Sequence, residues 1–251
     1  MRLSVIINTW ADTAELLPHC IDNYLPVCDD ILVIYSDTSN HGVTIPFMVP
    51  IGHERVKYFQ LEPNPDLTPL QNETRKRNFG LDKAREQGST HFLISDADEF
   101  YLQSDFLREK GRLETNGLNG FVCRLKVYIK EPTLWCNDHT LVPFIHKLLP
   151  NTCVGPFKYY PFTIDDKGQS HIDPSRRVNY SNRVEMSGMF MHHFSYVRKN
   201  IELKINNSSA NLKNSAQTIR DELRDAKPGY MSNLYHRELV ISPNYFNIPS
   251  W

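Results

Sequence analysis

The sequence has no apolar run that approaches the roughly 20 residues of a membrane-spanning helix. Met1 and Arg2 lead directly into an alternating strand pattern rather than into the apolar core of a signal peptide. We therefore expect no stable membrane insertion. The chain has five cysteines, an odd number, and none in C-x-x-C spacing. This usage favours free thiols in a reducing compartment, so we expect a cytoplasmic protein without a zinc site.

Internal repeats and linker-like stretches are also missing from the 251 residues. With 40% hydrophobic and 23% charged residues, the chain has enough apolar material for a sizeable core. We therefore predict a single domain over 1–251, with one functional half at 1–120 and a second at 121–251.

The net charge of −1 conceals a difference between the two halves. Residues 1–120 contain 11 basic and 18 acidic side chains, whereas residues 121–251 contain 17 and 11. A basic second half favours an anionic partner, although basic residues on an ordinary solvated surface would give the same count.

Hydrophobic patterning predicts an α/β fold. The segments 3–9, 30–35 and 56–61 are apolar and β-branched, which predicts strands, and 12–24 and 72–87 have helical periodicity. Further strands are expected at 91–94, 120–130, 141–149 and 185–196, and further helices at 105–113 and 200–226. This order predicts a mostly parallel, Rossmann-like sheet flanked by helices, followed by a loop-rich second half.

An acidic cluster directly follows the expected strand at 91–94. Asp96, Asp98 and Glu99 arrive within four residues, and on an extended backbone Asp96 and Asp98 point to the same face. Hard carboxylate oxygens at such a place suit Mg²⁺ or Mn²⁺, with solvated acids at a strand end as the alternative. The position favours a ligand site, because open α/β sheets bind ligands outside the carboxyl ends of their strands.

Four blocks in order carry a family resemblance. They read V-I-I-N-T-W-A-D, I-L-V-I-Y-S-D-T-S-N, R-N-F-G-L-D-K-A and F-L-I-S-D-A-D-E-F. This series resembles the donor half of family-two glycosyltransferases with the GT-A fold, and it covers residues 1–130. The resemblance implies a metal-dependent enzyme that moves a sugar from a nucleotide-diphosphate donor, a UDP-sugar first of all, to an acceptor hydroxyl.

The resemblance also implies roles for residues of the first half. Thr9 and Asp37 resemble the positions that hold the nucleobase, and Arg77 resembles one that reaches the donor nucleotide. Asp96 resembles the acid on the ribose and metal side, and Asp98 resembles the direct ligand of Mn²⁺ or Mg²⁺.

The turn after the second strand departs from the family pattern. The usual Asp-Asp-Gly-Ser is here Ser36-Asp37-Thr38-Ser39, so only one of its acids remains. The choice of nucleobase is therefore left open.

The block H-H-F-S-Y-V-R-K with a lysine downstream is similar to the histidine-aromatic block of related transferases. That likeness places His193 at the metal, with His192 as the close alternative and a buried structural histidine as the other interpretation. Arg198, Lys199 and Lys204 would then add cations for the donor phosphates. We expect at least one of these three to be ordinary surface charge.

An inverting transferase needs a carboxylate that deprotonates the acceptor hydroxyl. We prefer Glu185, which lies on the strand expected to carry the histidines, and next Asp165 in the loop region before that strand. The other candidates of the second half are Asp138, Asp166 and Asp173. We also predict that Asp98→Ala abolishes turnover and leaves the fold intact.

The acceptor is expected to be a glycan or DNA. The small form without a membrane segment also resembles phage-encoded transferases that decorate modified bases in DNA. A sugar-nucleotide pyrophosphorylase is an alternative interpretation. Such an enzyme would need a glycine-rich phosphate-binding loop after the first strand, where N-T-W-A-D-T has no glycine. A non-catalytic nucleotide-sugar-binding module and a metal-dependent phosphatase or nuclease are the remaining alternatives.

Overall fold

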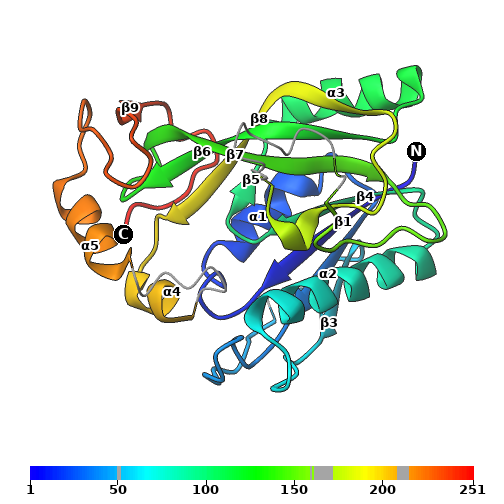
Figure 1. The fold of residues 1–251 in the computed structure, drawn as a ribbon, viewed down its shortest axis with the longest axis horizontal. Helices are drawn as coiled ribbons and strands as arrows, with labels where there is room; N and C mark the ends of the chain where they lie inside the picture. The colour runs from blue at the N-terminus through cyan, green and yellow to red at the C-terminus, as the bar shows by residue number, and fades with distance from the viewer. Residues whose placement is uncertain (50–51, 159, 161–171, 208–214) are drawn as a thin grey trace.

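The protein is described by a computed structural model that covers residues 1–251 except 50–51, 159, 161–171 and 208–214. Its centre is a curled sheet with the strand order β3-β2-β1-β4-β7-β6-β8-β5, and β9 adds beside β7 (Figure 1). Helices flank the sheet. The predicted α/β architecture is confirmed.

The first half of the chain forms the parallel part of the sheet. Its strands are β1 (Leu3–Thr9), β2 (Asp30–Tyr35), β3 (Val56–Gln60) and β4 (His91–Asp96). Each runs parallel to its neighbours among these four. Since the chain direction is shared, their carboxyl ends lie at one edge of the sheet, where Asn8 of β1 stands beside Asp96 of β4.

Alternate residues of β1 belong to two layers of core. Val5 packs in one apolar cluster with α1 (Leu17–Tyr24) and α3 (Gln103–Asn116). Ile6 packs in the other cluster with α2 (Pro69–Glu86). Because neighbouring strand residues point to opposite faces, α1 and α3 cover one face of the parallel sheet and α2 covers the other.

Two helices begin at places that differ from the prediction. α1 starts at Leu17 instead of near residue 12, since Pro18 is tolerated only in the first turn of a helix. α2 starts at Pro69, ahead of the expected residue 72, because Thr68 and Gln71 form a reciprocal capping box.

The second half extends the same sheet. Its strands are β6 (Gly120–Ile129), β7 (Leu134–Lys147), β8 (Val184–Tyr196) and β9 (Val240–Ile241), and the short β5 (Glu99–Phe100) of the first half pairs with β8. β6 runs parallel to β8 and antiparallel to β7, while β7 joins this half to β4. β7 is longer than the predicted 141–149, because its first part pairs with β6, which local pattern does not reveal.

Three further short elements complete the described fold, and the first two of them lie at the carboxyl edge of the parallel strands. They are the 3₁₀ turn η1 (Pro174–Arg176), α4 (Ile201–Asn207) and α5 (Ala216–Asp225). The single helix predicted at 200–226 is therefore two helices in the described residues. No helix in the described part of the chain combines the length and apolarity needed to cross a membrane.

Candidate functional site

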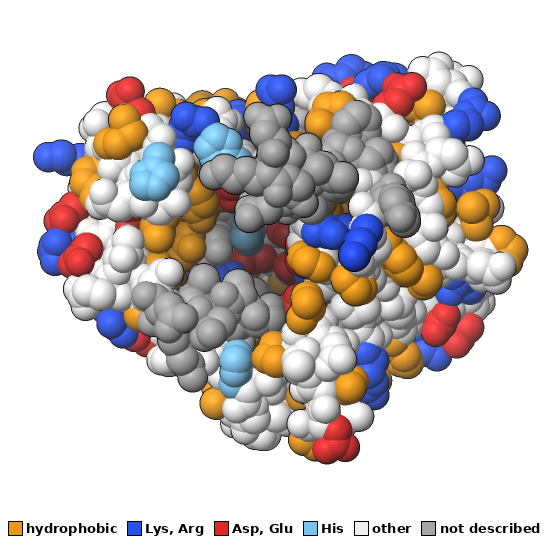
Figure 2. All heavy atoms as spheres, viewed as in Figure 1, with side chains coloured by type: hydrophobic (Ala, Val, Ile, Leu, Met, Phe, Trp, Pro, Cys, Tyr) orange, Lys and Arg blue, Asp and Glu red, His pale blue; other side chains and the backbone are white. Residues whose placement is uncertain are grey.

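A cavity of about 370 Å³ lies at the carboxyl edge of the parallel strands. Residues of β1, β4 and α2 line it from the first half, and residues of β7, β8, η1 and α4 line it from the second. Figure 2 shows acidic side chains and a histidine deep in a hollow near the centre of the molecule. We take this cavity as the candidate functional site, because open α/β sheets bind ligands at this edge.

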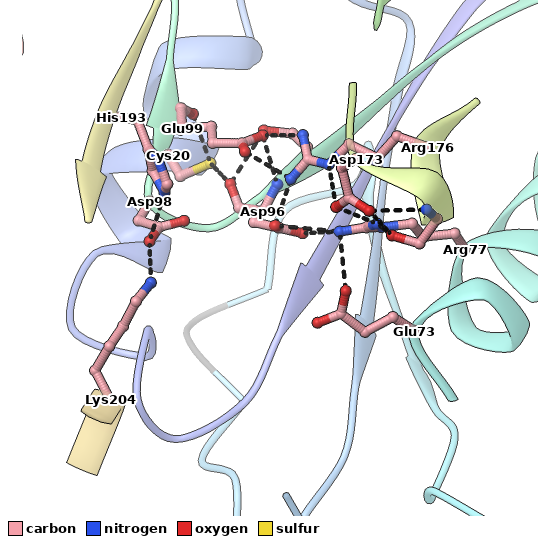
Figure 3. A network of polar contacts seen from close by, with 12 residues as sticks. Cys20, Glu73, Arg77, Asp96, Asp98, Glu99, Asp173, Arg176, His193 and Lys204 are labelled. Carbon is pink, nitrogen blue, oxygen red and sulfur yellow. Dashed lines mark hydrogen bonds and ion pairs between the residues drawn. The ribbon is translucent and has the colours of Figure 1, made fainter. Parts of the chain in front are cut away.

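Asp98 is the acidic centre of the cavity, and Figure 3 shows His193 and Lys204 directed toward its carboxylate. Its Oδ2 contacts the guanidinium of Arg198, lies 3.1 Å from Lys204 Nζ, and lies 3.3 Å from His193 Nε2. Burial alone would raise the pKa of Asp98, but Lys204, His193 and Arg198 together hold that pKa well below its ordinary value. The carboxylate is therefore fully ionised, and the cavity wall beside it is rich in donors for an anion.

Asp96 forms a second ion-pair group with two buried arginines. Arg77 Nη2 lies 3.3 Å from Asp96 Oδ2, and the Arg176 guanidinium contacts the same oxygen. Arg176 also lies 2.6 Å from Glu99 Oε1. Burial pushes the pKa of Asp96 up, but Arg176 and Arg77 outweigh it and lower that pKa. For Glu99 burial prevails, and its pKa is raised.

Asp173 joins this group from η1. Its Oδ2 lies 3.1 Å from Arg77 Nη1 and 3.7 Å from Arg176 Nε, while its Oδ1 accepts from the backbone N–H of Ser175 at 2.8 Å. Burial opposes ionisation, yet Arg77 and Arg176 lower the pKa of Asp173. Asp173 thus shares two arginines with Asp96, which brings the second half of the chain against the acids at the end of β4.

Thr9 and Asp37, the predicted nucleobase residues, direct their polar atoms elsewhere. Thr9 lines the cavity, but its hydroxyl lies 2.8 Å from the Thr13 hydroxyl on the α1 side of the sheet. Asp37 is not part of the lining, and its carboxylate accepts from Phe47 N at 2.7 Å and from Gln60 Nε2 at 3.1 Å. Both side chains therefore brace local structure.

Other predicted residues lie away from the cavity. Glu185 is half exposed at the start of β8, with Arg112 as its ion-pair partner at 3.5 Å, so its position does not support the role of a base. Lys199 places its ammonium 5.4 Å from the centre of the Trp251 ring, which matches our expectation of one surface cation. Asp165 falls outside the described residues.

The two adjacent histidines point to opposite faces of β8, as strand geometry requires. His193 faces Asp98, while His192 is buried on the other side with Nδ1 2.8 Å from the Tyr128 hydroxyl. Burial lowers the pKa of His192 to about 3, so it is a neutral core residue. Of the two histidines, only His193 faces Asp98.

Three cavity residues did not stand out in the sequence. Arg176 is one of the basic residues of the second half from which an anionic partner was expected, but it is buried between carboxylates. Lys76 Nζ donates to the backbone carbonyl of Thr9 at 2.6 Å, and burial lowers its pKa to about 8. Asn8 is buried and lines the cavity. For Lys76 the only signal was its place beside Arg77 on the helix that enters the site.

The fit of a metal ion can be judged from the donor set. In the described part of the chain, no group of three or more His, Cys, Asp or Glu side chains is placed to hold a metal. Asp98 and His193 do converge, and a divalent cation that takes its other ligands from phosphates and water needs no more than one or two protein ligands. The pair therefore fits Mn²⁺ or Mg²⁺ in the presence of a phosphorylated ligand.

Comparison with known proteins gives distant structural matches. No model of a known family and no curated protein matches the chain. TarS of S. aureus, residues 1–349, a GT-A-type glycosyltransferase, matches with a TM-score of 0.43 and 17% identity over 78% of this chain and 61% of that chain. A longer TarS structure matches with a TM-score of 0.44 and 16% identity over 89% of this chain and 43% of that chain.

A third match is the TarS 1–349 complex with UDP-GlcNAc, with a TM-score of 0.35 and 17% identity over 51% of this chain and 35% of that chain. The chain spans less than two thirds of each of these structures. The functional assignment therefore rests on the residues of the site.

Proposed function

We propose that the protein is a glycosyltransferase that moves a sugar from a nucleotide-diphosphate donor to an acceptor hydroxyl. The observation that carries the proposal is the ionised Asp98 at the strand edge, ringed by His193, Arg198 and Lys204. A diphosphate leaving group gains negative charge as the glycosidic bond breaks. Buried, fixed cations at that place stabilise such charge more than water does.

Lys204 is the cation best suited to this task, because it is the more accessible of the two cations, Arg198 and Lys204, that contact Asp98. Its side chain is 13% exposed and reaches the cavity from α4, whereas Arg198 is fully buried and also donates to the Asp12 carbonyl at 2.9 Å. Mn²⁺ or Mg²⁺, held by Asp98 and His193, would supply further neutralisation of the diphosphate when bound.

We assign the base that accepts the acceptor's proton to Asp173. Among the described residues of the second half, two carboxylates line the cavity, Asp173 and Asp138. Each accepts hydrogen bonds from the residue two positions further on, Ser175 or Thr140, so these local bonds do not distinguish them. Asp173 also shares two arginines with Asp96 and so lies beside the donor-side acids. A base must stand close to the attacked carbon, which favours Asp173.

The structure gives less support to DNA as the acceptor than did the excess of basic residues in the second half of the sequence. Arg176 lies inside the ion-pair group, Arg177 donates to the Ile172 carbonyl at 2.9 Å, and Arg183 donates to the Asn116 carbonyl at 2.9 Å. These three arginines therefore bond within the chain, which weakens the argument for an anionic acceptor that the charge of the second half supplied. The proposal therefore keeps the acceptor as a hydroxyl-bearing glycan, with a modified DNA base as the second candidate.

Calorimetric titration with UDP, UDP-GlcNAc, CDP and GDP, each with and without Mn²⁺, tests the donor. Turnover is then measured as nucleotide release with and without an acceptor mixture. We expect one nucleotide to bind, and Asp173→Asn to bind it within a few-fold of wild type while turnover falls by about 100-fold or more, the usual contribution of a general base.

Asp138→Asn is the matched control, and we expect it to keep most of its turnover. No binding of any nucleotide would overturn the proposal. Binding without product would indicate a non-catalytic module, and product formed only with water would indicate a hydrolase. Full activity of Asp173→Asn would show that a residue other than Asp173 is the base.

A further inference from the structure

Asn8 carries a buried amide without partners in the wall of the cavity. The residue is 9% exposed, both polar atoms of its amide are buried, and neither Oδ1 nor Nδ2 has a hydrogen-bond partner in the described part of the chain. The other polar residues of the strand end differ, since the Thr9 hydroxyl bonds to Thr13 and the Ser36 hydroxyl lies 3.4 Å from Lys76 Nζ. A buried amide is normally satisfied, so its retention at a cavity wall indicates partners that a ligand supplies.

The place of Asn8 in the sheet separates it from the phosphate-binding cations. Asn8 lies on β1 opposite Ile34 of β2 and Asp96 of β4, on the face covered by α2. Lys76 of α2 reaches the same strand end through the Thr9 carbonyl. Arg198 and Lys204 gather instead around Asp98, from the far end of β8 and from α4.

The chemistry of a carboxamide narrows the choice of ligand group. It presents one acceptor and one donor side by side, and only a group with both functions satisfies both atoms. A phosphate only accepts, so it would leave Oδ1 unpartnered. The edge of a pyrimidine or purine base offers a donor next to an acceptor, as amide side chains exploit when they read bases.

We propose that Asn8 recognises the nucleobase of the donor, with Oδ1 accepting from the N3–H of uracil and Nδ2 donating to an adjacent ring carbonyl. This assignment rests on the proposed function and deepens it. It places base recognition on Asn8 instead of on Thr9 or Asp37, whose polar atoms bond within the chain. Lys76 stands beside it as a donor for a second base carbonyl.

Asn8→Leu tests the assignment, because leucine has a similar shape and removes both hydrogen-bonding atoms. Loss of an unpartnered buried amide should leave the ligand-free protein at least as stable as wild type, measured as the urea midpoint. Titration with UDP should show an affinity about tenfold lower or weaker, because the base then meets an apolar wall. A merely structural asparagine would give the opposite stability result.

Asn207→Leu is the matched control. Asn207 also lines the cavity, but its Oδ1 accepts from the Ser39 hydroxyl at 2.9 Å and its Nδ2 donates to the Leu203 carbonyl at 3.0 Å. We expect this variant to lose stability and to keep the preference of wild type among nucleobases.

Ligand analogues identify the group that Asn8 contacts. Wild type should bind 3-methyl-UDP at least about tenfold more weakly than UDP, and Asn8→Leu should not distinguish the two. The Asn8→Leu penalty should persist for 2′-deoxy-UDP and for uridine. A penalty that disappears with 2′-deoxy-UDP would place the contact on the ribose, and one that disappears with uridine would place it on the phosphates; either overturns the assignment.

The two proposals fail in different ways. If wild type binds none of the nucleotides, the proposed function fails and this assignment with it. If wild type binds UDP and Asn8→Leu binds it equally well, only the assignment of Asn8 is overturned.

Discussion

Asp98→Asn should destabilise the ligand-free protein as well as inactivate it. The substitution keeps the shape of the side chain and removes its charge. Asp98 is 2% exposed, and its partners Arg198 and Lys204 are 0% and 13% exposed. The change therefore leaves a fully buried guanidinium and a largely buried ammonium without their counter-ion. This revises the expectation that the fold would be unaffected by loss of Asp98.

The expected loss of stability depends on how well Arg198 and Lys204 can find other partners once the charge of Asp98 is removed. Removal of one partner from a buried ion pair costs about 3–5 kcal/mol. Arg198 keeps two backbone acceptors, the carbonyls of Asp12 and Ser195, and Lys204 can turn toward solvent from α4. Both effects favour the lower end of that range, so we expect a loss of about 3 kcal/mol.

Urea unfolding followed by circular dichroism at pH 7, without nucleotide, measures the effect. The double variant Asp98→Asn with Arg198→Met should lose less than the sum of the two single variants, because it removes the stranded charge together with its partner. Asp82→Asn is the control: this exposed acid pairs with Arg85 on the surface, and its loss should change stability by less than about 0.5 kcal/mol. A loss below about 1 kcal/mol for Asp98→Asn would refute the reasoning.

Two further predictions concern stability. Burial lowers the pKa of His146 from 6.5 to about 4, so the folded state resists protonation and its stability should fall as pH drops from 6.5 toward 4. Between pH 7 and 5 we expect this histidine to account for a loss of about 2 kcal/mol in the free energy of unfolding. Urea titrations should find this loss in wild type and not in His146→Gln. Gly80→Ala should lower the free energy of unfolding by about 1–3 kcal/mol, because a Cβ there overlaps the Ile6 side chain. Gly111 of α3 has open space around it, so Gly111→Ala should be neutral or stabilising. Equal urea midpoints for the two glycine variants would contradict this prediction.

Local patterns were sufficient where burial alone shapes an element. The strands at 3–9 and 30–35 appear with the predicted bounds, because an uninterrupted apolar, β-branched run allows little else. Asp96 stands at the end of β4, as predicted, but Asp98 lies in the turn that follows and not on the extended backbone that was expected to carry both acids. Pairing with distant segments was not visible in the same way, as the early start of β7 shows.

Sequence patterns alone located Asp96 and Asp98 and indicated the resemblance to a donor-binding half. They also predicted that cations lie near Asp98. Only the tertiary structure decided which polar groups remain available to a ligand. Thr9 and Asn8 are neighbours of similar polarity, yet strand parity turns one toward Thr13 and leaves the other unpartnered at the cavity. The physical reason is that an element depends on residues close in sequence, whereas the satisfaction of a polar group depends on partners that only folding brings near.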